Sequence, residues 1–367
     1  MVLNEEQQLL KDTIAGFLNE HAPTSALREL RDNPDAPAWQ DTLWQQLCEM
    51  GVPAAAQPES EGGLGFGWLG QGAILREMGA RLTASPLISS VIFAAAVVRH
   101  CASAEQAQQW LPGLTEGTEI GSVAFQEKSH FHVDAQLTEG PTGAISGKKM
   151  FVPGASKARS LFVTARRNNG DFGIARVTLP LHGVEIAEEL LFDGNRYAQV
   201  LFDQTEISDA NWLQGTDIEA GFQRAIDEAT IALSAEMIGG ARALLTHTVD
   251  YLCEREQFGV KIGSFQALQH RCAQAYCQLE LAESAVLSAL TALDNNQTDL
   301  RDTASRAKAM VSDAYEHISN EAVQLHGGMG VTDEMDVGLF LKRSRVCNQM
   351  FGDANWHRER FASLRGL

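Results

Sequence analysis

The sequence lacks the features of secreted, membrane-spanning and nucleic-acid-binding proteins. No basic segment followed by an apolar one opens the chain, so we expect no signal peptide. No apolar run approaches the roughly 18 residues of a transmembrane helix, and the longest, Val91 to Val98, is typical of a buried helix. Lys and Arg number 29 against 47 Asp and Glu. The net charge of −18 therefore argues against binding to nucleic acid or to a membrane surface.

Cysteine pairs and metal-binding clusters are also missing. The six cysteines show no C-x-x-C spacing, and free thiols in a reducing cytoplasm are the expectation. His130 and His132, with Asp134, place two imidazoles on one strand face, but no further ligands lie nearby. We favour a surface loop or strand here and predict no metal site. Neither a G-x-S-x-G nor an H-E-x-x-H motif occurs, which weakens hydrolase interpretations.

What is present divides 367 residues into three stretches of different texture. Residues 1–117 show helical periodicity, with Asn4 as a predicted cap of the first helix. Residues 118–210 contain short β-like runs separated by turn signals, and residues 211–367 return to long amphipathic helices. The predicted fold is α+β and mainly α. It has an N-terminal helical domain, a small central antiparallel β-barrel or sandwich, and a C-terminal four-helix bundle. The predicted strands are Gly121 to Phe125, Lys149 to Val152, Leu161 to Ala165, Gly173 to Leu179 and Ala198 to Phe202.

A glycine-rich match to a nucleotide fingerprint carries little weight. Gly65 to Gly70 fits G-x-G-x-x-G by letter, but it follows a polar loop instead of a strand, and no βαβ pattern surrounds it. We therefore assign no Rossmann-type nucleotide site to it.

The stretch from Arg255 to Gln269 closes one predicted helix, turns at glycines and opens the next. Gly259 and Gly263 let backbone approach a ligand, and the fork of Arg255 suits phosphate oxygens. Ser264 is a predicted cap for the following helix. The alternative interpretation is a plain helical hairpin with an ordinary surface arginine.

A second glycine-rich stretch ends the third long helix of the C-terminal region. Its residues are Gln324-Leu325-His326-Gly327-Gly328-Met329-Gly330. Gly327 and Gly328 fit a helix C-cap, and they equally permit backbone to lie flat against a ligand.

Four segments together resemble the acyl-CoA dehydrogenase family, in the family's order and over nearly the whole chain. Arg255 to Gly259 with Phe265 to Gln269 is similar to one signature, and Gln324 to Gly330 to another. Pro58 to Gly65 resembles the N-terminal P-E-x-x-G-G-x-G loop, and Gly147 to Val152 the G-x-K-x-[WF]-[IV] strand of the β domain.

The resemblance implies FAD as cofactor and an acyl-CoA thioester as substrate, in lipid metabolism of the β-oxidation type. A carboxylate removes the α proton, the β hydrogen passes as hydride to flavin N5, and electron-transfer flavoprotein receives the electrons. The FAD site of the family is completed across a subunit interface, which implies a dimer or tetramer. The implied cofactor contacts are Arg255, Gln257, Phe258, Gln266, Gln324, Gly327 and Gly328.

The resemblance leaves the catalytic base open. Many members carry it in a Y-E-G-T-like segment near the C-terminus, where this chain has Gly352 in the glutamate position and Asp353 one residue later. Some relatives carry it on the first helix of the bundle, where Ala229 matches and Glu228 precedes it. One residue on a helix turns a side chain by about 100°. Asp353 is therefore the first candidate and Glu228 the second.

Two segments of the β domain also depart from the family pattern. Ala124 to His130 stands where a typical member has a T-E-P-x-x-G-S-D-like loop, and Pro153 stands where a flavin-contacting threonine is usual. Gly352 to Arg358 resembles a bacterial branch that includes subunits of heterotetrameric (α2β2) dehydrogenases acting on steroid side-chain thioesters. In such pairs one subunit supplies the base.

Three functional hypotheses follow. The first is a catalytic acyl-CoA dehydrogenase. The second is a non-catalytic or half-site subunit of a heterotetramer with a paralogous chain. The third is a flavin-dependent acyl-CoA oxidase that reacts with O₂.

Overall fold

The computed structural model describes residues 3–59 and 63–367, which form two compact units. We call Glu29–Leu64 with Ala84–Ala229 the sheet unit, and Met1–Arg28 with Gly65–Thr83 and Thr230–Leu367 the bundle unit. The three-domain division at residues 117 and 210 stays a prediction. Of the predicted Pro58–Gly65 loop, residues 60–62 lie outside the described part. No helix of the described residues is long and apolar enough to cross a membrane.

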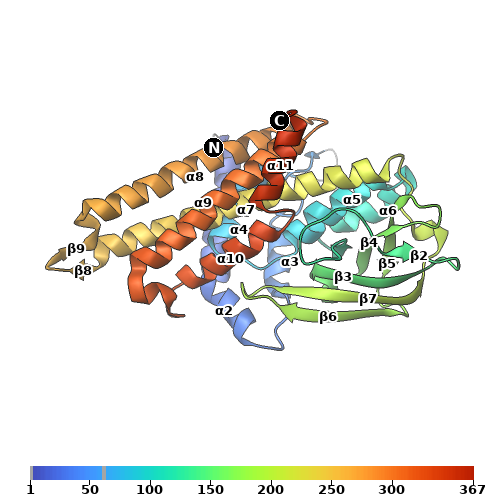
Figure 1. Cartoon of the computed structure of the whole chain (residues 1–367), viewed down its shortest axis with the longest axis horizontal. Helices are drawn as coiled ribbons and strands as arrows, with labels where there is room; N and C mark the ends of the chain where they lie inside the picture. Colours follow the sequence, from blue (N-terminus) through green and yellow to red (C-terminus); the bar gives the residue numbers. More distant parts are fainter. Residues whose placement is uncertain (1–2, 60–62) are drawn as a thin grey trace. The chain divides into compact units, whose positions relative to one another are not determined.

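The sheet unit is built on a seven-stranded sheet in the order β1-β4-β2-β3-β7-β6, with β5 paired to β4 (Figure 1). The strands are β1 (Gly121–Ala124), β2 (Thr138–Glu139), β3 (Ala144–Pro153), β4 (Ser160–Arg166), β5 (Phe172–Thr178), β6 (Val184–Leu190) and β7 (Arg196–Glu206). The all-antiparallel expectation is wrong, because β1 and β2 run parallel to β4. All five predicted strand regions are confirmed.

The sequence prediction missed β2 and the edge strand β6. Ala187 follows Ile186 directly and Glu188 precedes Glu189, which breaks the alternation begun at Val184, so the sequence of β6 lacks a clear β pattern. Its register with β7 is set instead by Val184 and Ile186, which pack against the core of the sheet. Charged side chains along an edge strand also discourage pairing with other chains.

The helices of the sheet unit include a π-helix. They are α3 (Asp41–Glu49), the π-helix η2 (Leu87–Ala94), α5 (Ala95–Cys101) and α6 (Ala104–Thr115). The predicted buried helix at Val91 to Val98 is confirmed, although its first half has π geometry. Ser90 of η2 is fully buried, and its Oγ accepts a hydrogen bond from Gly121 N at 2.9 Å. This bond joins η2 to the start of β1.

The bundle unit contains α1 (Glu5–His21), α4 (Gly67–Ala80), α8 (Gln266–Asp294), α9 (Arg301–His326), α10 (Val337–Gln349) and α11 (Ala354–Leu364). The long helix α7 (Ile218–Glu254) contributes its residues from Thr230 onward. α8 and α9 lie side by side, as the predicted bundle requires (Figure 1). The predicted cap is confirmed, since Asn4 accepts from Gln7 N in a capping box. The short helix α2 (Thr24–Asp32) has residues in both units.

The glycine fingerprint at residues 65–70 has a packing role. Asp294, at the end of α8, accepts hydrogen bonds from Trp68 N at 2.5 Å and Leu69 N at 3.1 Å. A Cβ on Gly67 would lie 2.5 Å from that carboxylate. The N-terminus of α4, where a bound phosphate would lie in a dinucleotide fold, is therefore filled by the chain's own anion.

Helices α4 and α7 approach each other through glycines. A Cβ on Gly79 would lie 2.0 Å from Glu236 O, and one on Gly239 would lie 1.9 Å from Arg76 O. Backbone oxygens cannot move aside as a flexible side chain can, so this crossing requires glycine at both positions.

We predict that Gly79→Ala destabilises the protein by about 1 to 3 kcal/mol, because the new methyl group overpacks the crossing. Chemical denaturation measures the change. The matched control is Gly338→Ala in α10, whose Cβ would meet nothing within 4 Å. It should stabilise the helix by up to about 1 kcal/mol. Equal effects of the two substitutions would contradict the prediction.

Candidate functional site

The predicted cofactor residues are gathered at one end of the bundle unit. Between α7 and α8 the chain forms a small hairpin of β8 (Glu256–Gln257) and β9 (Val260–Lys261), followed by η5 (Ile262–Ser264) (Figure 1). Phe258 at its tip has a φ of +55° and is 91% exposed. Arg255, Gln257 and Gln266 are also exposed. The Arg255 guanidinium makes no hydrogen bond or ion pair with the described residues.

Two predictions about the hairpin need correction. Ser264 does not cap α8, because its Oγ donates to Lys261 O at 2.7 Å and Phe265 occupies the cap position. Gly263 does not face open space, since a Cβ there would lie 2.9 Å from Leu252 O. Gly259 does face open space, with φ +79° and nothing within 4 Å of a Cβ. Of the two glycines, only Gly259 therefore leaves room for a ligand.

The second glycine segment lies at the same end of the unit. Helix α9 ends at His326, and Gly327 to Val331 form the turn η6. The His326 ring stacks on Tyr251 of α7 at 4.2 Å, which places this turn beside the root of the hairpin. Gln324, Gly327 and Gly328 are exposed, and a Cβ on either glycine would meet nothing within 4 Å.

These residues fit a large anionic dinucleotide. The Arg255 fork has no partner among residues 3–59 and 63–367, and the open glycines let a flat ligand approach the backbone. His326 is buried and its Nδ1 lies 2.8 Å from Ala322 O, while its Nε2 has no hydrogen-bond partner in the described structure. Burial lowers the pKa of His326, so the ring is neutral and Nε2 is an acceptor.

Asp353, the first candidate base, follows a sharp reversal between α10 and α11. Phe351 and Gly352 both have positive φ, +56° and +99°. Asp353 then caps α11, and its Oδ1 accepts from Trp356 N at 2.8 Å. A Cβ on Gly352 would lie 2.8 Å from the Trp356 ring and 3.2 Å from His357 Nε2. The position that carries glutamate in many family members therefore has no room for a side chain.

Glu228, the second candidate, is held by two arginines and a histidine within the sheet unit. It is 4% exposed, and its Oε1 lies 2.8 Å from His100 Nε2 and 2.9 Å from Arg224 Nε, while Arg99 lies 3.8 Å away. Burial raises the pKa of Glu228. The three partners lower it by more than burial raises it, so the pKa lies below its usual value. Such a carboxylate accepts a proton reluctantly, so the geometry favours Asp353 over Glu228 as the base.

The loop after β1 is organised by a buried ion pair that sequence reasoning missed. Lys149 of β3 is fully buried, and its Nζ bonds to Glu127 and donates to Thr164 Oγ1 at 3.0 Å. Glu127 also accepts from Gln136 N and Leu137 N at 3.1 Å. Burial lowers the pKa of Lys149 to about 8, against the opposing effect of Glu127. The sequence contained one indication of this ion pair, because Lys149 is the lysine of the predicted G-x-K-x-[WF]-[IV] strand.

The strand end beside this loop is irregular. The pairing of β3 with β7 shifts between Lys149 and Val152, and Phe151 has a φ of +54°. Pro153 carries no donor, and its carbonyl accepts from Ser122 Oγ at 2.7 Å. The Ser122 hydroxyl beside this position is thus occupied within the protein.

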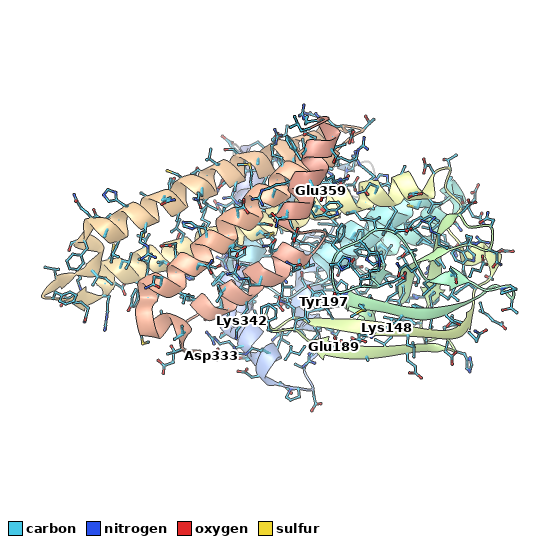
Figure 2. The ribbon with its side chains drawn as sticks, viewed as in Figure 1. Lys148, Glu189, Tyr197, Asp333, Lys342 and Glu359 are labelled. Atoms are coloured by element: carbon cyan, nitrogen blue, oxygen red, sulfur yellow. The ribbon has the colours of Figure 1, made fainter. Side chains whose placement is uncertain are left out.

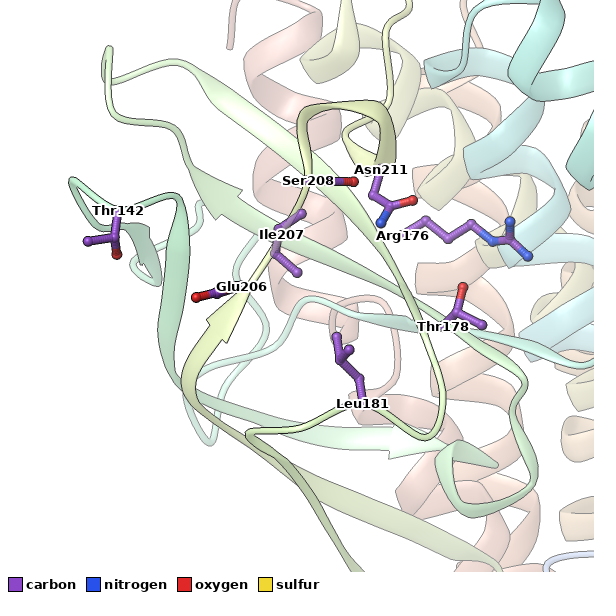
Figure 3. A pocket seen from close by; sticks show the side chains of 8 residues that line it. All are labelled: Thr142, Arg176, Thr178, Leu181, Glu206, Ile207, Ser208 and Asn211. Atoms are coloured by element: carbon purple, nitrogen blue, oxygen red, sulfur yellow. The ribbon is translucent and has the colours of Figure 1, made fainter.

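A pocket of about 450 Å³ lies elsewhere in the sheet unit, lined by Arg176, Thr178 and Glu206 among others (Figure 3). Figure 3 shows Arg176 extending away from Glu206. Its Nε donates to Ser160 Oγ at 3.0 Å, and its guanidinium lies over Trp110 at 4.8 Å. The polar groups of the lining do not converge on one point, so we assign no chemistry to this pocket.

Comparisons with known proteins agree with the segments described above. The model of the acyl-CoA dehydrogenase N-terminal domain matches residues 4–118, and that of the acyl-CoA dehydrogenase C-terminal domain matches residues 220–363. The acyl-CoA dehydrogenase IpdE2 of Mycolicibacterium smegmatis is 29% identical over 352 residues, covering 95% of this chain and 96% of the relative.

Two solved structures have closely similar folds. A variant of the Tcur3481-Tcur3483 steroid ACAD aligns with a TM-score of 0.87 at 27% identity, covering 100% of this chain and 99% of that one. The ChsE4-ChsE5 complex from Mycobacterium tuberculosis aligns with a TM-score of 0.88 at 23% identity, covering 100% and 98%.

We predict that Glu127→Gln destabilises the protein by about 3 to 5 kcal/mol, because it leaves the Lys149 charge buried without a counter-charge. Denaturant unfolding measures this, with the exposed Glu185→Gln of β6 as the control. The double change Glu127→Gln with Lys149→Met should recover part of the loss. A double variant no more stable than Glu127→Gln alone would contradict the ion-pair explanation.

A second prediction concerns acid stability. Burial, with the charge of Lys308, lowers the pKa of His357 from 6.5 to about 3. The unfolded chain therefore binds a proton that the folded chain does not, and stability is lost as the pH falls below 6.5. The wild type should lose up to about 1.4 kcal/mol per pH unit relative to His357→Gln. Denaturant unfolding curves measured at several pH values below 6.5 test this loss of stability. The control is His182→Gln, at an exposed position. Parallel curves for wild type and His357→Gln would refute it.

Proposed function

The chain belongs to the acyl-CoA dehydrogenase family, and from this premise we propose that Asp353 removes the α proton of an acyl-CoA thioester. As a member of the family the protein is an FAD-dependent acyl-CoA dehydrogenase. The identity of the base, the electron acceptor and the partner chain are our proposals. Electron-transfer flavoprotein is the proposed acceptor.

The observation that carries the cofactor assignment is the exposed end of the bundle unit. Phe258, Val260 and Phe265 of the hairpin, with Met329 and Val331 of the turn, are large apolar side chains left in contact with solvent. An apolar patch rimmed by Arg255 and glutamines is typical of a binding surface. Cofactor and a second subunit together would cover it, as the family's shared site implies.

On this surface we assign the FAD contacts to this chain's own residues. Arg255 would bind the pyrophosphate, while Gln257, Phe258 and Gln266 would lie along the adenosine end. Gln324, Gly327 and Gly328 would present a flat backbone to the dinucleotide. The chemistry that FAD supplies when bound is acceptance of the β hydrogen with its electron pair.

Asp353 has the properties that proton removal requires. Its Oδ1 accepts from Trp356 N, which fixes the orientation of the carboxylate. Its Oδ2 makes no hydrogen bond to the described residues, so this oxygen is the one we assign to the α proton. A base acts within hydrogen-bond reach of the proton that it takes, and a half-buried position limits competition from water.

A half-site subunit is the second candidate function. The position of the usual glutamate is Gly352, where a side chain has no room. Two structural neighbours bear names that pair two different chains. In such an arrangement a paralogous subunit would supply the base, and this chain would supply fold and cofactor surface.

Purification of the chain alone separates the two candidates. Yellow protein with one FAD per chain and a homo-oligomeric mass would support the first. Turnover is then measured with butyryl-CoA, isovaleryl-CoA and a steroid side-chain thioester, using an artificial electron acceptor. Flavin or activity that arises only after co-expression with a paralogous chain would support the second. Reoxidation by O₂ as fast as by the acceptor would favour an oxidase.

We predict that Arg255→Ala weakens FAD binding by about 1.5 to 3 kcal/mol, because a charge-assisted contact to phosphate is lost. The ratio of flavin absorbance to protein after dialysis measures retention. Arg365→Ala, which removes an exposed arginine paired with Asp302, is the control. Full flavin content in Arg255→Ala would show that the arginine has no cofactor role.

We further predict that Asp353→Asn keeps fold and flavin but lowers kcat by orders of magnitude, since an amide cannot accept the proton. Glu228→Gln should keep most activity if it keeps its fold. Activity that survives in Asp353→Asn and disappears in a folded Glu228→Gln would assign the base to α7. If neither substitution matters in the assembled complex, the partner subunit supplies the base.

A further inference from the structure

Lys308 of α9 is a fully buried amine without an ion-pair partner among the described residues. Its side chain has 0% exposure and forms no ion pair with the described residues. Its Nζ donates to two backbone carbonyls, Asn348 O at 3.0 Å and Gly352 O at 2.8 Å. Burial of an ammonium is costly, and an apolar side chain of the same length would fill the space more cheaply. We therefore look for the role of the lysine in the backbone carbonyls that it binds.

The two carbonyls belong to the segment that carries the proposed base. Asn348 lies in the last turn of α10, whose carbonyls have no partner within the helix. A positive charge is favourable at that end of the helix dipole. Gly352 O belongs to the peptide that joins Gly352 to Asp353. Lys308 thus ties the end of α10 to the peptide immediately before the proposed base.

A second buried side chain completes the arrangement. His357 of α11 has its Nε2 2.9 Å from Phe351 O, and its Nδ1 lies 3.4 Å from Ser305 Oγ of α9. Both residues with positive φ, Phe351 and Gly352, therefore have their carbonyls bound from inside the bundle. A turn with this unusual backbone persists only where its surroundings hold it.

We propose that Lys308 is a positioning residue that fixes the Gly352–Asp353 peptide and so holds the Asp353 carboxylate in place for α-proton removal. The inference rests on the proposed function, because Asp353 acts as the base there. Lys308 itself does not touch substrate in this account.

The charge of Lys308 also acts on Asp353. Burial lowers the pKa of Lys308 to about 7, while Cys347 of α10 and Asp353 oppose that effect. His357 of α11 lies within the electrostatic reach of both Lys308 and Arg360. Below about pH 7 Lys308 is protonated and donates to both carbonyls as an ammonium.

The first test uses hydrogen exchange on the full chain with FAD, without substrate. In Lys308→Met the amides of residues 348–357 should exchange about fivefold faster or more, because the turn loses two carbonyl contacts. Amides of α8 should be unchanged. The control is Lys342→Met on α10, a lysine without a hydrogen bond or ion pair in the described structure (Figure 2). Unchanged exchange in residues 348–357 would overturn the proposal.

The second test uses steady-state kinetics with the thioester turned over fastest in the panel above. Lys308→Met should lower kcat on the order of 10- to 100-fold while KM changes little, because the base is misplaced and the binding surface is intact. A purely structural lysine would produce no such separation of kcat from KM. Lys308→Arg tests whether another cationic donor restores kcat.

The outcomes separate this inference from the proposed function. If Asp353→Asn is inactive and Lys308→Met has wild-type kcat, the positioning role is wrong while the base assignment stands. If Asp353→Asn is fully active, the base assignment is wrong, and the positioning role fails with it even if exchange in the turn increases. Faster exchange and a lower kcat with little change in KM in Lys308→Met, with inactive Asp353→Asn, support both.

Discussion

The irregular segments of this chain depend on buried or half-buried ionisable side chains that bind backbone. Lys308 holds two carbonyls of the C-terminal turn, and Asp294 holds two amides at the start of α4. Glu127, paired with Lys149, holds the amides of Gln136 and Leu137. Helices and sheets satisfy their own backbone groups, whereas a turn or loop must find other partners. A charged partner binds about twice as strongly as a neutral one and is correspondingly costly to remove.

This constraint bears directly on the reaction. An acyl-CoA dehydrogenase needs a carboxylate in a defined place, and a loop is a poor support unless its backbone is fixed. In this chain the turn around Gly352 is fixed by Lys308 and His357, so the carboxylate that follows it, Asp353, inherits a defined position. The same packing excludes a side chain at residue 352. The proposed base and the turn are thus parts of one arrangement.

The two candidate bases differ because their neighbours differ. Glu228 lies among Arg224, His100 and Arg99, which keep it ionised and occupied. Asp353 has one oxygen on a helix amide and the other without a described partner. Nothing in the spacing of either residue along the chain distinguishes a salt-bridged carboxylate from a base. The distinction comes from residues of α5 in one case and from the N-terminus of α11 in the other.

The sequence alone determined the order of helices, sheet and bundle, because periodicity and turn residues act over a few positions. It also determined the family, since the motifs at residues 255–269 and 324–330 are contiguous. Only the tertiary structure revealed the acidic edge strand β6 and the parallel pairing of β1 with β4, because neighbouring strands decide both. The role of Lys308 could not be predicted from the sequence either, because it depends on residues that are distant along the chain. Its carbonyl partner at Gly352 lies 44 residues away, and burial of a lysine has no local signature.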